Sequence, residues 1–166
     1  DGFYKGTTAK MIISEMAKGN GLISEYDLAN YSPVYREPVI GTFKDIEVIS
    51  MGPPSSGGLL LIHMLNALEN FQLDTLGWNS TDYLHLLTEV AKRAYADRAQ
   101  HLGDPDFWKN PRDLFLSKTY AASRVANISM KIHTPSKQVH PGSYEDNESD
   151  ETTHYSVVDN EGNRSE

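Results

Sequence analysis

The sequence predicts an α+β fold, and two observations lead to this prediction. Apolar residues recur at helical spacing through most of the 166-residue chain, which is typical of amphipathic helices. Two short runs in 37–51, and a third that begins at residue 152, have instead the composition and pattern of strands. The length suits one ordinary domain.

The N-terminal part is predicted to contain one helix and one short helical turn. The helix covers 3–18 and ends at Gly19-Asn20-Gly21, whose residues tolerate a positive φ. Ser24 and Asp27 have the spacing of a capping box and predict the helical turn, which ends before Pro33. The apolar face of the helix consists of Ala9, Ile12, Ile13, Met16 and Ala17.

Two strands and a loop are predicted next. The strands, Pro38–Phe43 and Ile46–Ser50, are joined by a turn at Lys44-Asp45. The stretch 52–58 consists only of Gly, Pro and Ser residues, which favour a loop. We expect this loop to lead directly into a helix.

Four further helices are expected in the middle of the chain. The first begins between 57 and 59 and ends at 70, and the second covers 82–100 after a cap at Ser80 or Thr81. A short helix follows Asn110-Pro111, and the last covers 116–128. The expected inward faces are Leu61, Met64, Leu65 and Leu68 in the first; Leu84, Leu87, Ala91, Ala94 and Tyr95 in the second; and Tyr120, Ala121, Val125 and Ile128 in the last.

The last part of the chain changes character. Residues 131–151 are polar and become acidic, so we expect an exposed, mobile loop with few apolar side chains to hold it. Residues 152–159 then predict a strand, and 160–163 predict a hairpin turn. A strand needs partners for its backbone groups, so we expect the second strand of the hairpin to lie beyond Glu166, in a longer gene product.

The composition argues against several classes of function. The formal net charge of −8 disfavours binding to nucleic acid or to an anionic membrane surface, because both need a basic face. No apolar run approaches the roughly 18 residues of a membrane span. Cysteine is absent, which excludes disulfides, thiolate metal sites and a cysteine nucleophile. The histidines lack a zinc-binding spacing, so no metal site is predicted.

One candidate site is the helix start formed by 53–58. Free N–H groups at a helix N-terminus, together with serine hydroxyls, can bind an anion. The stretch matches neither a phosphate-binding P-loop nor the Gly-x-Ser-x-Gly nucleophile elbow. A rigid strand-to-helix turn with a serine cap is the simpler interpretation. A noncatalytic anion-binding or scaffold module is the alternative function that this site suggests.

The second candidate is Thr152, which follows the acidic segment at the start of a predicted strand. A threonine hydroxyl is a poor nucleophile without an adjacent base. If the bond between Glu151 and Thr152 is cut, the α-amine of Thr152, with a pKa of about 8, becomes that base. The alternative is an ordinary strand that begins with threonine, a residue that strands favour.

Several motifs occur in an order that closely resembles the γ-glutamyltranspeptidase family. Each motif alone is weak, but the ordered set is specific and covers essentially the whole chain, and its strongest member is the Thr-Thr-His-Tyr-Ser strand. The motifs are Phe3-Tyr4-Lys5-Gly6, Gly21-Leu22-Ile23, Asp27-Leu28-Ala29-Asn30-Tyr31, Pro53-Pro54-Ser55-Ser56-Gly57-Gly58, Tyr95-Ala96-Asp97-Arg98, Leu102-Gly103-Asp104-Pro105-Asp106-Phe107 and Thr152-Thr153-His154-Tyr155-Ser156-Val157-Val158-Asp159.

The resemblance implies an N-terminal-nucleophile hydrolase with an αββα sandwich, made as a precursor that cuts itself into a large and a small subunit. Thr152 corresponds to the family's nucleophile, so the implied autocleavage site lies between Glu151 and Thr152. Residues 1–151 then correspond to the C-terminal part of the large subunit, with 131–151 as the loop before the cut, and 152–166 to the start of the small subunit. The substrate-binding residues are expected outside this chain, which alone should be inactive.

The reaction that the resemblance implies is γ-glutamyl transfer from glutathione or a related donor. The acceptor is an amino acid, a peptide or water, and the intermediate is a γ-glutamyl ester of threonine. The reaction requires neither a metal nor an organic cofactor. The two subunits are expected to pair after cleavage, and the resemblance implies a periplasmic or secreted protein.

Overall fold

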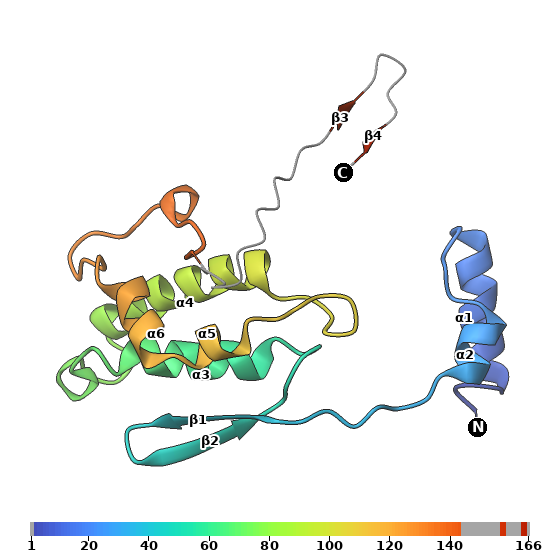
Figure 1. The fold of residues 1–166 in the computed structure, drawn as a ribbon, viewed down its shortest axis with the longest axis horizontal. Helices are drawn as coiled ribbons and strands as arrows, with labels where there is room; N and C mark the ends of the chain where they lie inside the picture. The colour runs from blue at the N-terminus through green and yellow to red at the C-terminus, as the bar shows by residue number, and fades with distance from the viewer. Residues whose placement is uncertain (1, 144–156, 159–163, 166) are drawn as a thin grey trace. The chain divides into compact units, whose positions relative to one another are not determined.

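The computed structural model describes residues 2–143, 157–158 and 164–165, and the chain divides into two compact units, Asp1–Glu37 and Pro38–Glu166 (Figure 1). Helices and antiparallel hairpins occur together, which confirms the α+β class. No helix in the described part of the chain is long and apolar enough to cross a membrane. In chain order the elements are α1 (Thr7–Lys18), α2 (Glu25–Asn30), β1 (Val39–Phe43), β2 (Ile46–Ser50), α3 (Gly57–Leu68), η1 (Leu73–Thr75), α4 (Thr81–His101), α5 (Arg112–Leu116), α6 (Lys118–Val125), η2 (Ser136–Gln138), β3 (Val157–Val158) and β4 (Arg164–Ser165).

The first unit contains α1 and α2. Helix α1 begins at Thr7, later than the expected residue 3, because Gly6 before it has an extended conformation. Helix α2 begins with the predicted capping box, in which the Asp27 N–H donates to Ser24 Oγ at 3.3 Å and the Ser24 N–H donates to Asp27 Oδ2 at 2.8 Å. These two bonds satisfy N–H groups that the start of the helix would otherwise leave free.

The β1–β2 hairpin forms at the predicted positions in the second unit. Ile40 pairs with Ile49 across the two strands, and Lys44 takes a positive φ of 52° in the turn. The hairpin packs against α3, where Gly41 lies against Ile62. A side chain at position 41 would meet Ile62, so glycine allows the strand to approach the helix closely.

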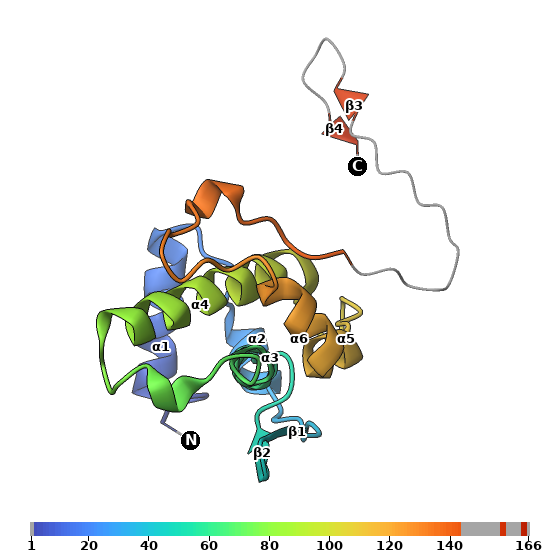
Figure 2. The same ribbon diagram turned by 90° about the vertical axis from the view of Figure 1, so that its left-hand side faces the viewer.

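Helix α3 lies between the hairpin on one side and α4 and α6 on the other, as Figure 2 shows along its axis. Its first turns and its last turn contribute to two different apolar clusters. Burial in two clusters makes α3 the central element of this unit. The clusters are Val39, Leu59, Ile62 and Phe115 near the start of α3, and Ala67, Leu86, Val90, Ala121 and Val125 near its end.

The expected inward faces of α3 and α4 are only partly correct. Leu61 on α3 is 45% exposed, and Leu84 and Tyr95 on α4 are 46% and 58% exposed. The remaining expected residues are buried or half-buried. On α4 the expected Ala94 is buried, and the fully buried face is completed by residues that were not expected, namely Leu86, Glu89, Val90, Arg93 and Asp97. The prediction was wrong because apolar periodicity assigns charged residues to the solvent side, whereas Glu89, Arg93 and Asp97 are buried.

Helices α5 and α6 follow the sequence prediction closely. Phe115 on α5 is fully buried, and the Ser117 hydroxyl caps α6 by accepting from the Tyr120 N–H at 3.1 Å. Ala121 and Val125 on α6 face the core, as predicted. The helix ends at Val125, one turn before the expected end at 128.

The C-terminal hairpin is described only where its two strands pair. Val157 pairs with Ser165, and Val158 pairs with Arg164, in an antiparallel arrangement. The expectation that the second strand lies beyond Glu166 is therefore wrong, because β4 begins within this chain. The expected strand residues 152–156 and the turn at 160–163 lie outside the described residues.

Adjacent glycines at the start of α3 are predicted to differ sharply in their tolerance of a side chain. A Cβ at Gly58 would overlap the carbonyl oxygen of Met51 and lie 2.7 Å from Val39 Cγ2, whereas a Cβ at Gly57 would meet only the Ser55 hydroxyl at 3.4 Å. We expect Gly58→Ala to lower the free energy of unfolding by about 1–3 kcal/mol. Gly57→Ala is the matched control and should leave it unchanged or raise it by up to about 1 kcal/mol. Urea unfolding of both variants tests this, and equal effects would contradict it.

Candidate functional site

The predicted nucleophile and cleavage site, Thr152 and Glu151, lie outside the described residues. The structure does describe the segment that leads toward them, from the end of α6 at Val125 to residue 143. This segment is bound along α4. The residues that hold the chain before the predicted cut therefore form the candidate site.

One face of α4 carries polar residues at every fourth position, which we call the α4 polar stripe. A spacing of four places residues on one face of a helix. Each member of the stripe makes a polar contact with the segment 127–142. This stripe is not among the features predicted from the sequence, although its regular spacing and the opposite charges of Glu89, Arg93 and Asp97 are visible there. The members are His85, Glu89, Arg93, Asp97 and His101.

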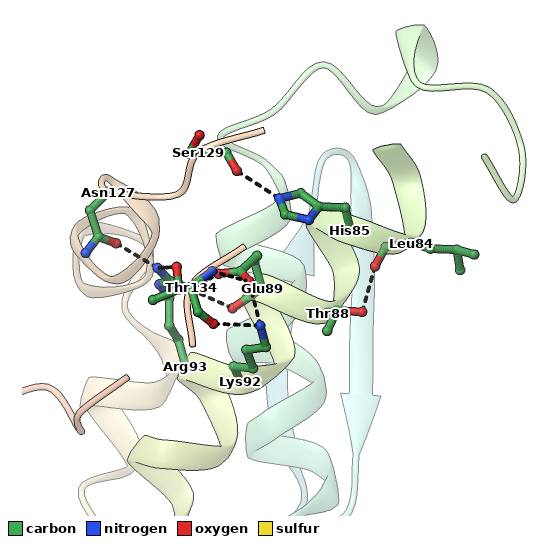
Figure 3. A network of polar contacts seen from close by, with 9 residues as sticks. All are labelled: Leu84, His85, Thr88, Glu89, Lys92, Arg93, Asn127, Ser129 and Thr134. Atoms are coloured by element: carbon green, nitrogen blue, oxygen red, sulfur yellow. Dashed lines mark hydrogen bonds and ion pairs between the residues drawn. The ribbon is translucent and has the colours of Figure 1, made fainter. Parts of the chain in front are cut away.

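The first part of the stripe binds the segment near Thr134 (Figure 3). Glu89 Oε1 accepts from the Thr134 N–H at 3.0 Å and from Lys92 Nζ at 2.6 Å, and Glu89 Oε2 accepts from Arg93 Nη1 at 2.8 Å. Arg93 Nη2 donates to Asn127 Oδ1 at 2.9 Å and to Thr134 Oγ1 at 3.3 Å. Glu89 and Arg93 are both buried and form an ion pair on α4. The hydrogen bonds with Thr134 and Asn127 place this pair under the segment and help to compensate its burial.

This environment determines the charge of Glu89. Burial raises the pKa of its carboxyl, but the hydrogen bonds from Lys92, Arg93 and Thr134 outweigh burial and lower the pKa to about 2. Glu89 is therefore ionised at neutral pH, and its negative charge is matched by two cations.

The second part of the stripe centres on Asp97, whose side chain is fully buried. Asp97 Oδ2 accepts from Tyr120 Oη at 3.0 Å and from Arg124 Nε at 2.9 Å. Asp97 Oδ1 lies 2.8 Å from Arg124 Nη2 and accepts from the Gly142 N–H at 2.8 Å. Burial raises the pKa of Asp97, but the bonds from His63, Gly142 and Arg124 outweigh it and hold the pKa below its usual value.

His63 from α3 completes the surroundings of Asp97. Its Nε2 lies 3.5 Å from Asp97 Oδ2, and its ring contacts the Tyr120 ring in a tilted arrangement. Its buried Nδ1 has no hydrogen-bond partner among the described residues. A proton on Nδ1 would be an unsatisfied buried donor, so this arrangement favours a proton on Nε2, where it points toward the carboxylate.

Both backbone polar groups of Gly142 make hydrogen bonds. Its N–H donates to Asp97, and its carbonyl oxygen lies 2.8 Å from His101 Nε2. A Cβ at this position would overlap the Tyr120 hydroxyl and lie 2.8 Å from Arg124 Cδ, so only glycine fits here without a shift. Arg124 Nη2 also donates to the His140 carbonyl at 2.7 Å.

These contacts change the interpretation of the segment 131–151. The side chains of 131–143 are largely exposed, as expected. Polar groups of α4 and α6, which the sequence did not predict as partners, bind the backbone of 131–143 at Thr134, His140 and Gly142. The expectation for this loop considers only apolar side chains, whereas backbone groups bonded to buried carboxylates provide the attachment. Residues 144–151 lie outside the described part.

The stretch 53–58 forms a turn that leads into α3. The Ser55 hydroxyl accepts from the Gly57 N–H at 3.3 Å, and the Ser56 hydroxyl accepts from Arg98 Nε at 2.8 Å. The expected turn is present, but the expected serine cap is only partial: Ser56 at the N-cap position makes no side-chain hydrogen bond to the helix, and Ser55 before it accepts from the Gly57 N–H. The turn borders a pocket of about 330 Å³, lined in part by Pro53, Ser56, Arg98, Gly103 and Asn110. Within the described residues, no group of three or more His, Asp or Glu side chains is placed to hold a metal ion.

Comparisons with known proteins give consistent results. The model of the family described as gamma-glutamyltranspeptidase matches residues 1–164. The chain is 47% identical over 163 residues to the glutathione hydrolase proenzyme of Escherichia coli (strain K12), and 41% identical over 163 residues to the acylase ACY 1 proenzyme of Pseudomonas sp. (strain SE83). Each match covers 98% of this chain but only 28% of the relative. The crystal structure of Helicobacter pylori gamma-glutamyltranspeptidase is similar with a TM-score of 0.75 and 40% identity, over 89% of this chain and 42% of that one.

The charge of Glu89 predicts a specific dependence of stability on pH. Its pKa is lowered in the folded state, so its contribution is complete above the unfolded value of 4.5 and is lost as the pH falls toward 2. Glu89→Gln leaves two buried or half-buried cations unmatched and should lower the free energy of unfolding at pH 7 by about 3–5 kcal/mol. The difference between wild type and variant should shrink progressively between pH 4.5 and pH 2.

Urea unfolding at a series of pH values measures this difference. Glu47→Gln on the exposed face of β2 is the matched control, and its effect should stay within about 0.5 kcal/mol. If the difference in the free energy of unfolding between wild type and Glu89→Gln stays constant between pH 4.5 and pH 2, the Glu89 carboxylate is not the group that titrates.

Proposed function

The chain belongs to the γ-glutamyltranspeptidase family, and we propose that it is part of a precursor enzyme that transfers γ-glutamyl groups and hydrolyses glutathione. The observation that carries this proposal is the match to the family over residues 1–164, a span that includes Thr152. The chain spans 28% of the length of the curated relatives. The activity is therefore proposed for the whole enzyme, and this chain alone should be inactive.

In the proposed reaction Thr152 is the nucleophile. Its Oγ attacks the γ-carbonyl carbon of glutathione or a related donor, and its own α-amine accepts the hydroxyl proton. The amine of the donor leaves with that proton, and a γ-glutamyl ester of Thr152 remains. Water, an amino acid or a peptide then attacks the ester and regenerates the threonine. Division of one acyl transfer into two steps is the usual gain of covalent catalysis, and the scheme uses no metal or organic cofactor.

The α-amine of Thr152 exists only after the chain is cut, so we propose autocleavage between Glu151 and Thr152. Thr152 Oγ attacks the Glu151 carbonyl, an N-to-O acyl shift gives an ester, and water cleaves the ester. Residues 1–151 then end the large subunit, and 152–166 begin the small subunit that pairs with it. The name proenzyme, which the Escherichia coli and Pseudomonas relatives carry, supports processing of this kind.

Three further features follow from family membership. We propose that the described helices and hairpins belong to an αββα sandwich that the rest of the enzyme completes. We propose a periplasmic or secreted location. We also propose γ-glutamyl compounds as the donors, because relatives at 47% and 40% identity are named glutathione hydrolases. A comparison of glutathione with an amide that carries a different acyl group, as substrates of the full-length enzyme, tests the last point.

The role of Thr152 predicts a graded response to substitution. In the full-length precursor, Thr152→Ala should abolish both self-cleavage and γ-glutamyl transfer, because it removes the hydroxyl that both reactions need. Thr152→Ser should retain part of both, since a hydroxyl and, after cleavage, an α-amine remain. Electrophoresis follows the cleavage, and release of the donor's amine follows the transfer.

The matched control is Thr153→Ala, which removes the neighbouring hydroxyl. Successive side chains of a strand point to opposite faces, so this change should impair cleavage less. N-terminal sequencing of the small subunit identifies the cut, and a start at any residue other than Thr152 would overturn the assignment. A precursor that stays whole would favour a noncatalytic module.

A further inference from the structure

Two side chains of opposite charge line the pocket of about 330 Å³ in the second unit. Arg98 lies in the last turn of α4, and Asp104 lies in the loop that follows this helix. Among the described residues, neither side chain forms an ion pair with the other or with a further charge. The volume is at the lower end of the range of small-molecule sites, which is about 300–1,000 Å³.

Arg98 is held in a way that leaves its terminal nitrogens free for a ligand. Its Nε donates to the Ser56 hydroxyl at 2.8 Å. Within the described part of the chain, Nη1 and Nη2 make no hydrogen bond or ion pair. A guanidinium can donate two parallel hydrogen bonds to a carboxylate, so Arg98 presents a site for a carboxylate in this pocket.

Asp104 is held by neutral backbone groups. Its Oδ1 accepts from the Asp106 N–H at 3.0 Å, and its backbone carbonyl accepts from the N–H groups of Phe107 and Trp108 at 3.0 and 2.7 Å. These bonds fix the residue but supply no positive charge. The Asp104 carboxylate is therefore available to a cationic group such as an ammonium.

The rest of the pocket is fixed in part by one asparagine and is apolar in part. Asn110 Oδ1 accepts from the Gly103 N–H at 2.8 Å, and Asn110 Nδ2 donates to the Gly103 carbonyl at 3.0 Å. This pair of bonds holds the two ends of the loop together, so the ligand need not order it on binding. An aliphatic group can lie against the apolar lining, which consists of Pro53, Pro54, Ala99 and Leu102.

We propose that this pocket binds an α-amino acid, with its carboxylate on Arg98 and its ammonium on Asp104. A simple anion would meet the negative charge of Asp104, and a simple cation would meet the positive charge of Arg98. A zwitterion matches both charges and fits a pocket of this size. The inference goes beyond the proposed function and does not depend on it, since no step of the transfer is assigned to the pocket.

Three probes of different charge test the site in the full-length, uncut Thr152→Ala precursor. L-leucine carries both charges, N-acetyl-L-leucine carries only the carboxylate, and L-leucinamide carries only the ammonium. Saturation-transfer NMR of the ligand methyl groups gives the three dissociation constants. Arg98 and Asp104 are exposed, so each charge should contribute about twofold to fivefold to the affinity, and L-leucine should bind the most tightly.

Single variants assign each charge of the ligand to its partner. Asp104→Asn should weaken L-leucine about twofold to fivefold without weakening N-acetyl-L-leucine. Arg98→Gln should weaken both carboxylates by a similar factor and should not weaken L-leucinamide. Asp106→Asn is the matched control, because this neighbouring carboxylate does not line the pocket, and it should leave all three affinities unchanged.

The double variant Arg98→Gln/Asp104→Asn separates this pocket from any other site for the same probes. Binding of L-leucine that is equal in this variant and in its parent overturns the proposal. Two results for Asp104→Asn also overturn it: an equal loss for L-leucine and N-acetyl-L-leucine, which indicates a structural defect, and a gain for L-leucine, which indicates an anion site. None of these results affects the proposed function, because no residue of the pocket takes part in the proposed reaction.

Discussion

The buried carboxylate of Asp97 is the constraint on which the described arrangement of the second unit depends. A buried charge is costly unless hydrogen bonds and an opposite charge compensate it. Its partners come from three other parts of the chain, namely His63 on α3, Tyr120 and Arg124 on α6, and Gly142 in the segment that follows. None of these parts can move away from α4 without loss of a partner for the carboxylate, so a single side chain couples four parts of the fold.

Helix α4 combines two kinds of contact on neighbouring faces. Leu86, Val90 and Ala94 join the apolar core, and a polar stripe offset from them by three residues binds the following segment. Glu89 repeats the arrangement of Asp97 two turns earlier, with Arg93 and Lys92 as its cations. The apolar face places the helix in the core, while the two carboxylates select the path of the backbone beside it, because directional bonds specify position more strictly than apolar contacts do.

The buried carboxylates of α4 bear on the proposed chemistry because they hold the chain that precedes the proposed cleavage site in the sequence. An N-terminal threonine obtains its base only when the preceding bond breaks, so the precursor must bring that bond into position before any other group can assist. In the described part of the chain, α4 and α6 bind the backbone at Gly142 and His140, which precede the proposed cleavage site in the sequence.

Local signals allowed the sequence by itself to determine most of the elements, the capping box of Ser24 and Asp27, the hairpin turn at Lys44 and the family. These features depend on neighbouring residues or on ordered motifs, which a sequence displays directly. Only the tertiary structure decided that Glu89 and Asp97 are buried and that they hold Thr134 and Gly142. The reason is physical: a carboxylate is driven toward water unless partners distant in the sequence compensate its charge, and only the folded chain brings those partners together.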